Sequence, residues 1–165
     1  MTELLTKGLL WLHVFAGFSA FFIAPVVMIV KKGGTSHRTW GKRYLYAMAV
    51  VTITALALTV FRPNPFLFLI AIFSFYFAFS GYRVLRRKRP DKGQKPQRLD
   101  WAFALVTLLV SLGMVGWGVS KMVAGQIAFA TILLSFGGIG SVGIASDMRK
   151  FVRPSTERFA WWFDH

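Results

Sequence analysis

The sequence predicts an all-α integral membrane protein, a polytopic bundle of five transmembrane helices in a single membrane domain over residues 1–165. Of the 165 residues, 55% are hydrophobic and 16% are charged, whereas charged residues make up about a quarter of a soluble domain. Five stretches contain no Lys, Arg, Asp or Glu and approach the roughly 20 residues that a helix needs to cross a bilayer. The basic residues gather in a few connections between these stretches.

The uncharged stretches are the predicted membrane spans. They cover residues 8–30, 44–61, 65–82, 101–120 and 122–146. The second and third are close to the lower limit of length, so we expect their ends to extend into flanking residues. All five are apolar on every face, which favours helices over the alternating strands of a membrane barrel.

The first span holds His13, the only Lys, Arg, His, Asp or Glu within any span. An ionisable residue inside a membrane marks a candidate functional site. A neutral imidazole can also serve structure alone, by bonding to a backbone carbonyl of a neighbouring helix. Small residues recur at every fourth position of the first and fifth spans and predict close helix packing, within the chain or in a dimer: Ala16, Ala20 and Ala24, and Gly137, Ser141 and Ala145.

The basic connection 31–43 is the densest polar region. Gly33 and Gly34 free the chain, and Ser36 is expected to cap a short interfacial helix that runs into the second span. Basic side chains here and in the connection 83–98 are expected to contact anionic headgroups or to bind a phosphate or carboxylate ligand. These candidate residues are Arg38, Lys42, Arg43, Arg86, Arg87 and Lys88.

The remaining connections predict two hairpins. Pro63 and Pro65 cannot continue a helix, so residues 62–65 form a tight turn between the second and third spans. Residues 121–125 link the fourth and fifth spans, while residues 90–97 form a flexible basic linker. The Phe-rich third span is expected to face lipid or a partner protein.

The distribution of charge predicts the orientation. The formal net charge is +14, and 17 of the 20 Lys and Arg residues lie in the connections 31–43 and 83–98 and the C-terminal segment 147–165. Because cytoplasmic loops carry the Lys and Arg excess, we expect the N-terminus outside and the C-terminal segment in the cytoplasm. The charge thus indicates a bilayer with anionic headgroups as partner, and not a nucleic acid.

Several motifs together resemble an uncharacterised family of bacterial predicted integral membrane proteins. They are His13-x-x-x-Gly17, His37-Arg38-x-x-Gly41 with Tyr44, Ser80-Gly81-Tyr82-Arg83, and Asp147-Met148-Arg149-Lys150-Phe151. The resemblance implies a multi-pass protein of the bacterial inner membrane, with a sixth helix following the aromatic segment 159–165. It implies no activity.

Catalytic motifs are scarce. The chain has no cysteine, which excludes disulfides and thiolate chemistry, and it has no zinc-protease, nucleophile-elbow or phosphate-loop motif. No carboxylate lies inside a span, which argues against proton-coupled transport. We therefore predict a non-catalytic binding or accessory component of a larger membrane assembly, with a membrane protein or a second copy as partner.

The alternative is a membrane redox protein that binds haem b or a quinone. The candidate cofactor-binding residues are His13, His37 and His165. A haem held by two histidines needs both at matching depth in different helices. His13 is predicted near the outer face and His37 and His165 near the inner face, so only the last two could pair. Other conceivable iron ligands are Met28, Met48, Met114 and Met148.

Overall fold

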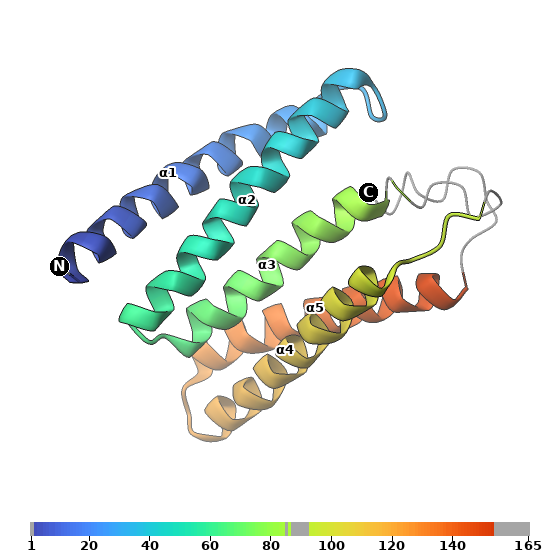
Figure 1. The fold of residues 1–165 in the computed structure, drawn as a ribbon. Helices are drawn as coiled ribbons and strands as arrows, with labels where there is room; N and C mark the ends of the chain where they lie inside the picture. Colours follow the sequence, from blue (N-terminus) through green and yellow to red (C-terminus); the bar gives the residue numbers. More distant parts are fainter. Residues whose placement is uncertain (1, 85, 87–92, 154–165) are drawn as a thin grey trace. The chain divides into compact units, whose positions relative to one another are not determined.

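The chain folds into long helices (Figure 1). The computed structural model describes residues 2–84, 86 and 93–153, and these residues form five α-helices. All five are long and apolar enough to span a membrane. Their lengths of 20 to 28 residues correspond to about 30 to 42 Å, against about 30 Å of hydrocarbon. The protein is therefore a multi-pass membrane protein; His165 and the rest of residues 154–165 lie outside the described residues.

The helices extend beyond the uncharged stretches at most of their ends. They are α1 (Thr2–Ile29), α2 (Thr35–Phe61), α3 (Pro65–Val84), α4 (Arg98–Val123) and α5 (Ile127–Val152). Lys and Arg are good helix formers, and at helix ends their charge can reach headgroups or water. For this reason α2 includes most of the predicted loop 31–43, and Lys121, predicted in a link, lies inside α4.

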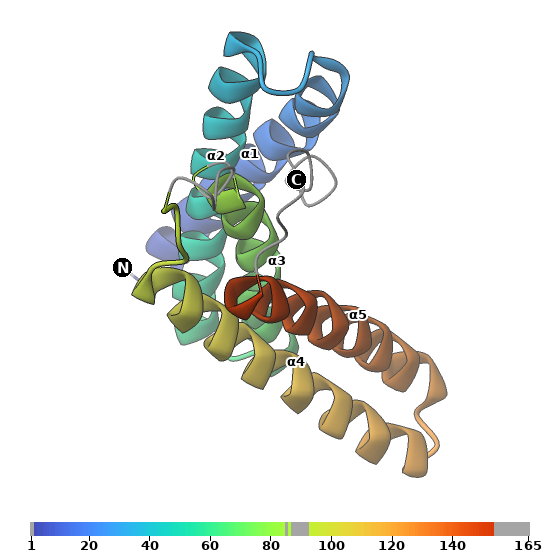
Figure 2. The ribbon, with the colours of Figure 1, turned by 90° about the vertical axis from the view of Figure 1, so that its right-hand side faces the viewer.

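The first compact unit covers residues 1–82 and holds α1, α2 and nearly all of α3. α1 and α2 lie side by side as an antiparallel pair, as both ribbon views show (Figures 1 and 2). Ala16 and Ala20 on α1 are buried, with 5% and 4% of their surface exposed. Such small side chains let two helix backbones approach closely. These two residues therefore serve packing within the chain.

The turn from α1 to α2 is closed by glycines. Gly33 has a φ of 81°, a left-handed conformation that glycine adopts without strain, and the Gly34 N–H donates to the Lys31 carbonyl at 3.1 Å. Gly34 is the residue that precedes the first helical position of α2, and no side chain caps this end. The prediction that Ser36 caps the helix is wrong, because the glycine turn lets the helix begin at Thr35.

The turn from α2 to α3 is as tight as predicted. The Arg62 N–H donates to the Leu58 carbonyl at 2.8 Å and ends α2. Asn64 Oδ1 accepts a hydrogen bond from the Leu67 N–H at 3.1 Å, as an N-cap residue does. Pro65 occupies the first position of α3, where its missing N–H costs nothing.

The second compact unit covers residues 83–165 and contains the α4–α5 hairpin. Gly125, with a φ of 76°, lies in its turn. The helices meet at Gly137, where a Cβ atom would lie 2.8 Å from the Ser111 carbonyl oxygen and 2.9 Å from the Val115 nitrogen. Met114 and Leu133 are fully buried. Gly137, predicted in a row of small residues, thus packs against a helix of the same chain.

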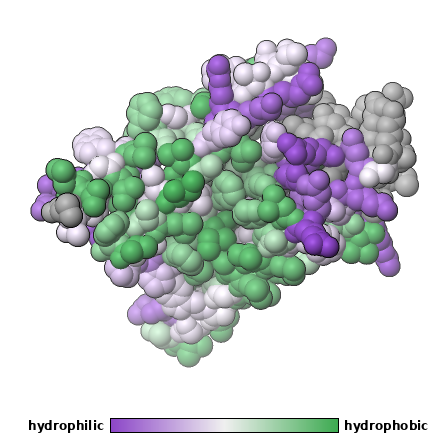
Figure 3. All heavy atoms as spheres, in the orientation of Figure 1, coloured by the Kyte–Doolittle hydropathy of each residue, from purple (hydrophilic) through white to green (hydrophobic). Residues whose placement is uncertain are grey.

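The outer surface is strongly apolar. Figure 3 shows hydrophobic residues over much of the visible face, with hydrophilic ones gathered around the α1–α2 turn at the upper right and along the right-hand side. Phe21, Leu109 and Ile139 each expose at least 66% of their surface. Apolar exposure on this scale suits lipid and not water. The phenylalanines of α3 differ in burial: Phe68 and Phe77 are exposed, but Phe73 is only 8% exposed. This helix therefore presents some of its aromatic rings to the surface and buries others.

Candidate functional site

His13 on α1 is bound to α2 through one nitrogen of its ring. Its Nδ1 lies 3.1 Å from the Val51 carbonyl oxygen and 3.0 Å from Thr54 Oγ1. The Thr54 hydroxyl donates to the Val50 carbonyl at 2.7 Å, with the Val51 carbonyl also within 3.0 Å. Both atoms that face Nδ1 are therefore acceptors. The structural hydrogen bond expected of an intramembrane histidine is present.

The hydrogen-bond partners assign the tautomer of His13. A carbonyl oxygen can only accept, and the single hydroxyl proton of Thr54 is already donated to backbone carbonyls. The imidazole proton must then be on Nδ1, because an unprotonated Nδ1 would place lone pairs against lone pairs. Nε2 carries a lone pair, and no partner for it exists among the described residues.

His13 lines a pocket of about 390 Å³ between the three helices of the first unit. α1 contributes its first half, α2 its second half and α3 its first half, so the pocket lies toward the N-terminus of α1 and the α2–α3 turn. The walls are mainly apolar, with a few polar side chains between them, a composition that is typical of small-molecule sites. The polar and charged side chains of the lining include Lys7, His13, Thr52, Thr59 and Arg62.

Thr52 is the second residue of this pocket with a polar atom that lacks a partner among the described residues. It is 8% exposed, and in the part of the chain that the structure describes its Oγ1 has no hydrogen-bond partner. A buried hydroxyl without a partner costs about 1–3 kcal/mol. Thr59, which lines the same pocket, is different because its hydroxyl donates to the Leu56 carbonyl at 2.7 Å. The Oγ1 atom itself is buried. Threonine in a helix has two accessible χ1 rotamers, so a ligand in the pocket would meet this hydroxyl only after a rotation about χ1.

Two basic residues also line the pocket. Lys7 Nζ pairs with Glu3 one turn away at 2.9 Å, and both side chains are largely exposed. Arg62 follows the last residue of α2 and is exposed. These side chains place positive charge near the end of the pocket, where the α2–α3 turn and the start of α1 lie.

His37 has a structural role at the opposite end of the unit. It is 3% exposed, and its Nδ1 lies 3.0 Å from the Val27 carbonyl oxygen. Val27 belongs to the last turn of α1, whose carbonyls have no partner within the helix. The contacts of His13 and His37 are separated by about four turns of α1, or roughly 21 Å. The structure therefore does not bring these two predicted cofactor residues together, and His165 lies outside the described residues.

The predicted anion-binding residues of the first unit lie on the first turns of α2. Arg38, Lys42 and Arg43 are all exposed, and the Arg43 guanidinium stacks over the Trp40 ring at 4.6 Å. Arg86 is exposed in the second unit, while Arg87 and Lys88 lie outside the described residues. That these residues bind anionic headgroups stays a prediction.

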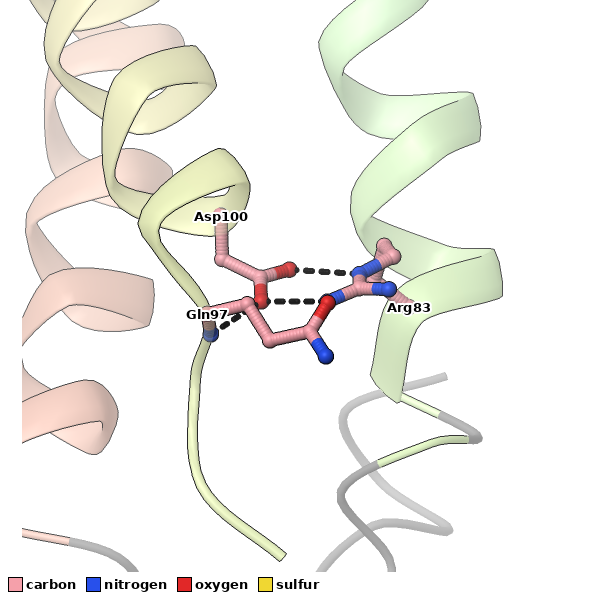
Figure 4. A network of polar contacts seen from close by, with 3 residues as sticks. All are labelled: Arg83, Gln97 and Asp100. Carbon is pink, nitrogen blue, oxygen red and sulfur yellow. Dashed lines mark hydrogen bonds and ion pairs between the residues drawn. The ribbon is translucent and has the colours of Figure 1, made fainter.

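A buried ion pair at the start of the second unit was not predicted from the sequence. The Arg83 Nε and Nη2 atoms donate to the two carboxylate oxygens of Asp100 at 2.8 and 2.7 Å (Figure 4). Gln97 joins them: its N–H donates to Asp100 at 2.7 Å, and its Oε1 accepts from Arg83 at 2.8 Å. The two charged side chains are 6% and 2% exposed. The sequence offered one signal for this pair: Arg83 and Asp100 carry opposite charges and lie at the two ends of the connection between α3 and α4.

This Arg83–Gln97–Asp100 cluster has the properties of a structural element. Asp100 forms a capping box with Gln97 at the start of α4, and a bidentate pair of this kind is among the stronger hydrogen-bonded contacts. Among the described residues no group of three or more His, Asp or Glu could hold a metal ion.

Comparison with known proteins adds no family. No protein-family model, no curated protein and no solved structure matches this chain. The resemblance drawn from the short motifs therefore stays a prediction, and the geometry of the pocket is the observation that bears on function.

Proposed function

We propose that this membrane protein binds a small lipid-soluble ring molecule with oxygen substituents, of the quinone class, in the pocket of the first unit. Two polar atoms without partners among the described residues carry the proposal: His13 Nε2 and Thr52 Oγ1, on residues that line one apolar pocket. An apolar ring would fill the space between the walls, and ring oxygens would reach His13 Nε2 and, after a rotation about its χ1 angle, Thr52 Oγ1.

The size and composition of the pocket support this class of ligand. A volume of about 390 Å³ is within the range of small-molecule sites. Lipid-soluble rings reach such a site from the bilayer, and apolar walls accept them without a charge to desolvate. A strongly charged metabolite would meet only Lys7, already paired with Glu3, and Arg62 as counter-ions.

Haem is a second candidate because of one further observation. A metal-binding histidine commonly donates its other ring N–H to a carbonyl, which is what His13 does toward Val51. An absorption spectrum of the purified protein separates the two ligands. A Soret band that disappears in His13→Ala would replace the quinone proposal with haem. The predicted accessory role, with a protein partner, would be favoured instead if neither ligand class bound.

A pocket-filling substitution tests the proposal. Ala55 and Ala71 both line the pocket, so Ala55→Phe or Ala71→Phe should occupy the space of the ligand. We expect tetramethyl-benzoquinone or tetramethyl-hydroquinone to stabilise the purified wild-type protein by about 2.7 kcal/mol at one hundred times the dissociation constant. The measurement is thermal unfolding in detergent with increasing ligand.

Ala102→Phe is the matched control, because Ala102 is exposed on α4. The proposal predicts stabilisation by ligand in the wild type and in Ala102→Phe, and its loss in the pocket-filling variants. Equal stabilisation of all four proteins would mean that the rings merely dissolve in the detergent and apolar surface, and it would refute the pocket as their site.

A further inference from the structure

We infer that the pocket selects the hydrogen-donating form of its ligand: a quinol or another ring that carries a hydroxyl group, in preference to a quinone. The inference rests on the proposed function and specifies it. It follows from the tautomer of His13, which leaves the free ring nitrogen able to accept a hydrogen bond and unable to donate one.

The tautomer of His13 is determined by hydrogen-bond acceptors on α2 and not by groups inside the pocket. Two acceptors face Nδ1, the Val51 carbonyl at 3.1 Å and Thr54 Oγ1 at 3.0 Å. Moving the proton to Nε2 would break the hydrogen bond to the Val51 carbonyl and would leave that carbonyl facing a bare nitrogen, in a part of the protein with little water. The backbone of α2 therefore holds His13 in the form whose Nε2 is a lone pair.

The chemistry of the two ligand forms then decides which one binds. A quinone oxygen has lone pairs only, and two lone pairs facing each other repel. A quinol hydroxyl has a proton to donate, and imidazole Nε2 is a strong neutral acceptor. Thr52 does not discriminate, because a hydroxyl can donate or accept. His13 is thus the specificity-determining residue, and Thr52 contributes to the affinity for both forms.

Three probes built on one tetramethyl ring test this inference with the purified protein in detergent. They are tetramethyl-hydroquinone, its dimethyl ether and tetramethyl-benzoquinone, titrated without oxygen at one fixed pH. The ether keeps the ring and replaces the two hydroxyl protons with methyl groups, so the quinone, which is no larger than the hydroquinone, is the size-matched comparison. We expect the hydroquinone to bind about tenfold more tightly than the other two, the factor that one ordinary hydrogen bond supplies.

Two variants sharpen the test. His13→Phe removes the acceptor and keeps an aromatic ring, so the three probes should bind with the same affinity. Thr52→Val should weaken the hydroquinone and the quinone together, while Thr59→Val, at a pocket hydroxyl that already has a partner, should leave both unchanged. Should His13→Phe fail to fold, the comparison of the three probes on the wild type still decides.

The outcomes separate the inference from the proposed function. Equal binding of the three probes to the wild type, or tighter binding of the quinone, would overturn the selectivity while the pocket remained a ligand site. Absence of binding by all three would refute the proposed function itself. Nitrogen NMR of labelled histidine provides a direct reading: a protonated Nε2 on the wild-type His13 would contradict the inference whatever the affinities.

Discussion

In the second unit, both carboxylate oxygens of Asp100 have partners from Arg83 and Gln97, whereas in the first unit Thr52 Oγ1 and His13 Nε2 have none among the described residues. All of these side chains lie in helices or at their ends. Polar groups that only hold a fold together are usually satisfied within it. Polar groups that are left without a partner beside a pocket indicate that the partner is a ligand and not another residue of the chain.

Unpaired atoms alone do not distinguish the two units. Ser111 Oγ in the second unit also has no partner within the described ranges 2–84, 86 and 93–153. It lies, however, on the face where α4 and α5 are in closest contact, with the Ser111 carbonyl 2.8 Å from where a Cβ of residue 137 would be. Thr52 lines a pocket of about 390 Å³. The space beside the unpaired group, and not the group itself, distinguishes the first unit.

The largest effect is expected at the Arg83–Gln97–Asp100 cluster. Asp100→Ala leaves the Arg83 guanidinium buried without its carboxylate, and it should lower the free energy of unfolding by about 3–5 kcal/mol. Unfolding in mixed detergents, followed by circular dichroism, measures it. The double variant Arg83→Met, Asp100→Leu should recover much of the loss.

Glu3→Ala is the control for that variant, because it breaks the exposed pair with Lys7. We expect a change within about 0.5 kcal/mol. Equal changes in the free energy of unfolding for Asp100→Ala and Glu3→Ala would mean that the buried cluster contributes no more to stability than an exposed ion pair. The second unit would then no longer serve as an example of polar groups that stabilise the fold.

The next effect concerns the contact of α4 with α5. A Cβ at position 137 would lie 2.8 Å from backbone and side-chain atoms of α4, while at position 138 nothing lies within 4 Å. Gly137→Ala should therefore destabilise the protein by about 1–3 kcal/mol. Gly138→Ala should stabilise it by about 0.5–1 kcal/mol through helix propensity. The same unfolding measurement applies, and two changes of the same sign would contradict the close packing.

The smallest effect discriminates between two threonines of the pocket. Without ligand, Thr52→Val removes a buried hydroxyl that has no partner, so it should raise the free energy of unfolding by about 1 kcal/mol. Thr59→Val removes a hydroxyl bonded to the Leu56 carbonyl and should lower it by about the same amount. A loss of stability in Thr52→Val would show that its hydroxyl is already satisfied, and the site would then depend on His13 alone.

The helices were the part of the structure that the sequence could predict. Uncharged runs locate spans because hydrocarbon excludes charge along the chain itself. The ends were less predictable, since Arg38, Lys42 and Lys121 are charged and helical at once. The tight turn at Asn64 followed from local rules for proline and asparagine, whereas the start of α2 depended on the conformation of Gly33.

The candidate site was predictable only in part. His13 was found because it is the lone ionisable residue of the predicted spans, and recognising it does not require knowing which side chains surround it in the structure. Thr52 was missed, since threonine is common in membrane helices and only the packing of α1, α2 and α3 reveals that its hydroxyl lacks a partner. The Arg83–Asp100 pair depends on how the last turn of α3 meets the first turn of α4, and no pattern within a single helix encodes this contact. Orientation and the identity of the membrane stay predictions.

Photo-crosslinking tests the central claim most directly. A hydroquinone that carries a diazirine group is added to the purified protein, activated by light, and located by peptide mass spectrometry. We expect labels on the pocket-lining segments around His13 and Thr52, competed away by tetramethyl-hydroquinone. Labels spread over the lipid-facing residues of all helices, or concentrated on α4 and α5 and insensitive to competition, would contradict the assignment of the pocket as a ligand site.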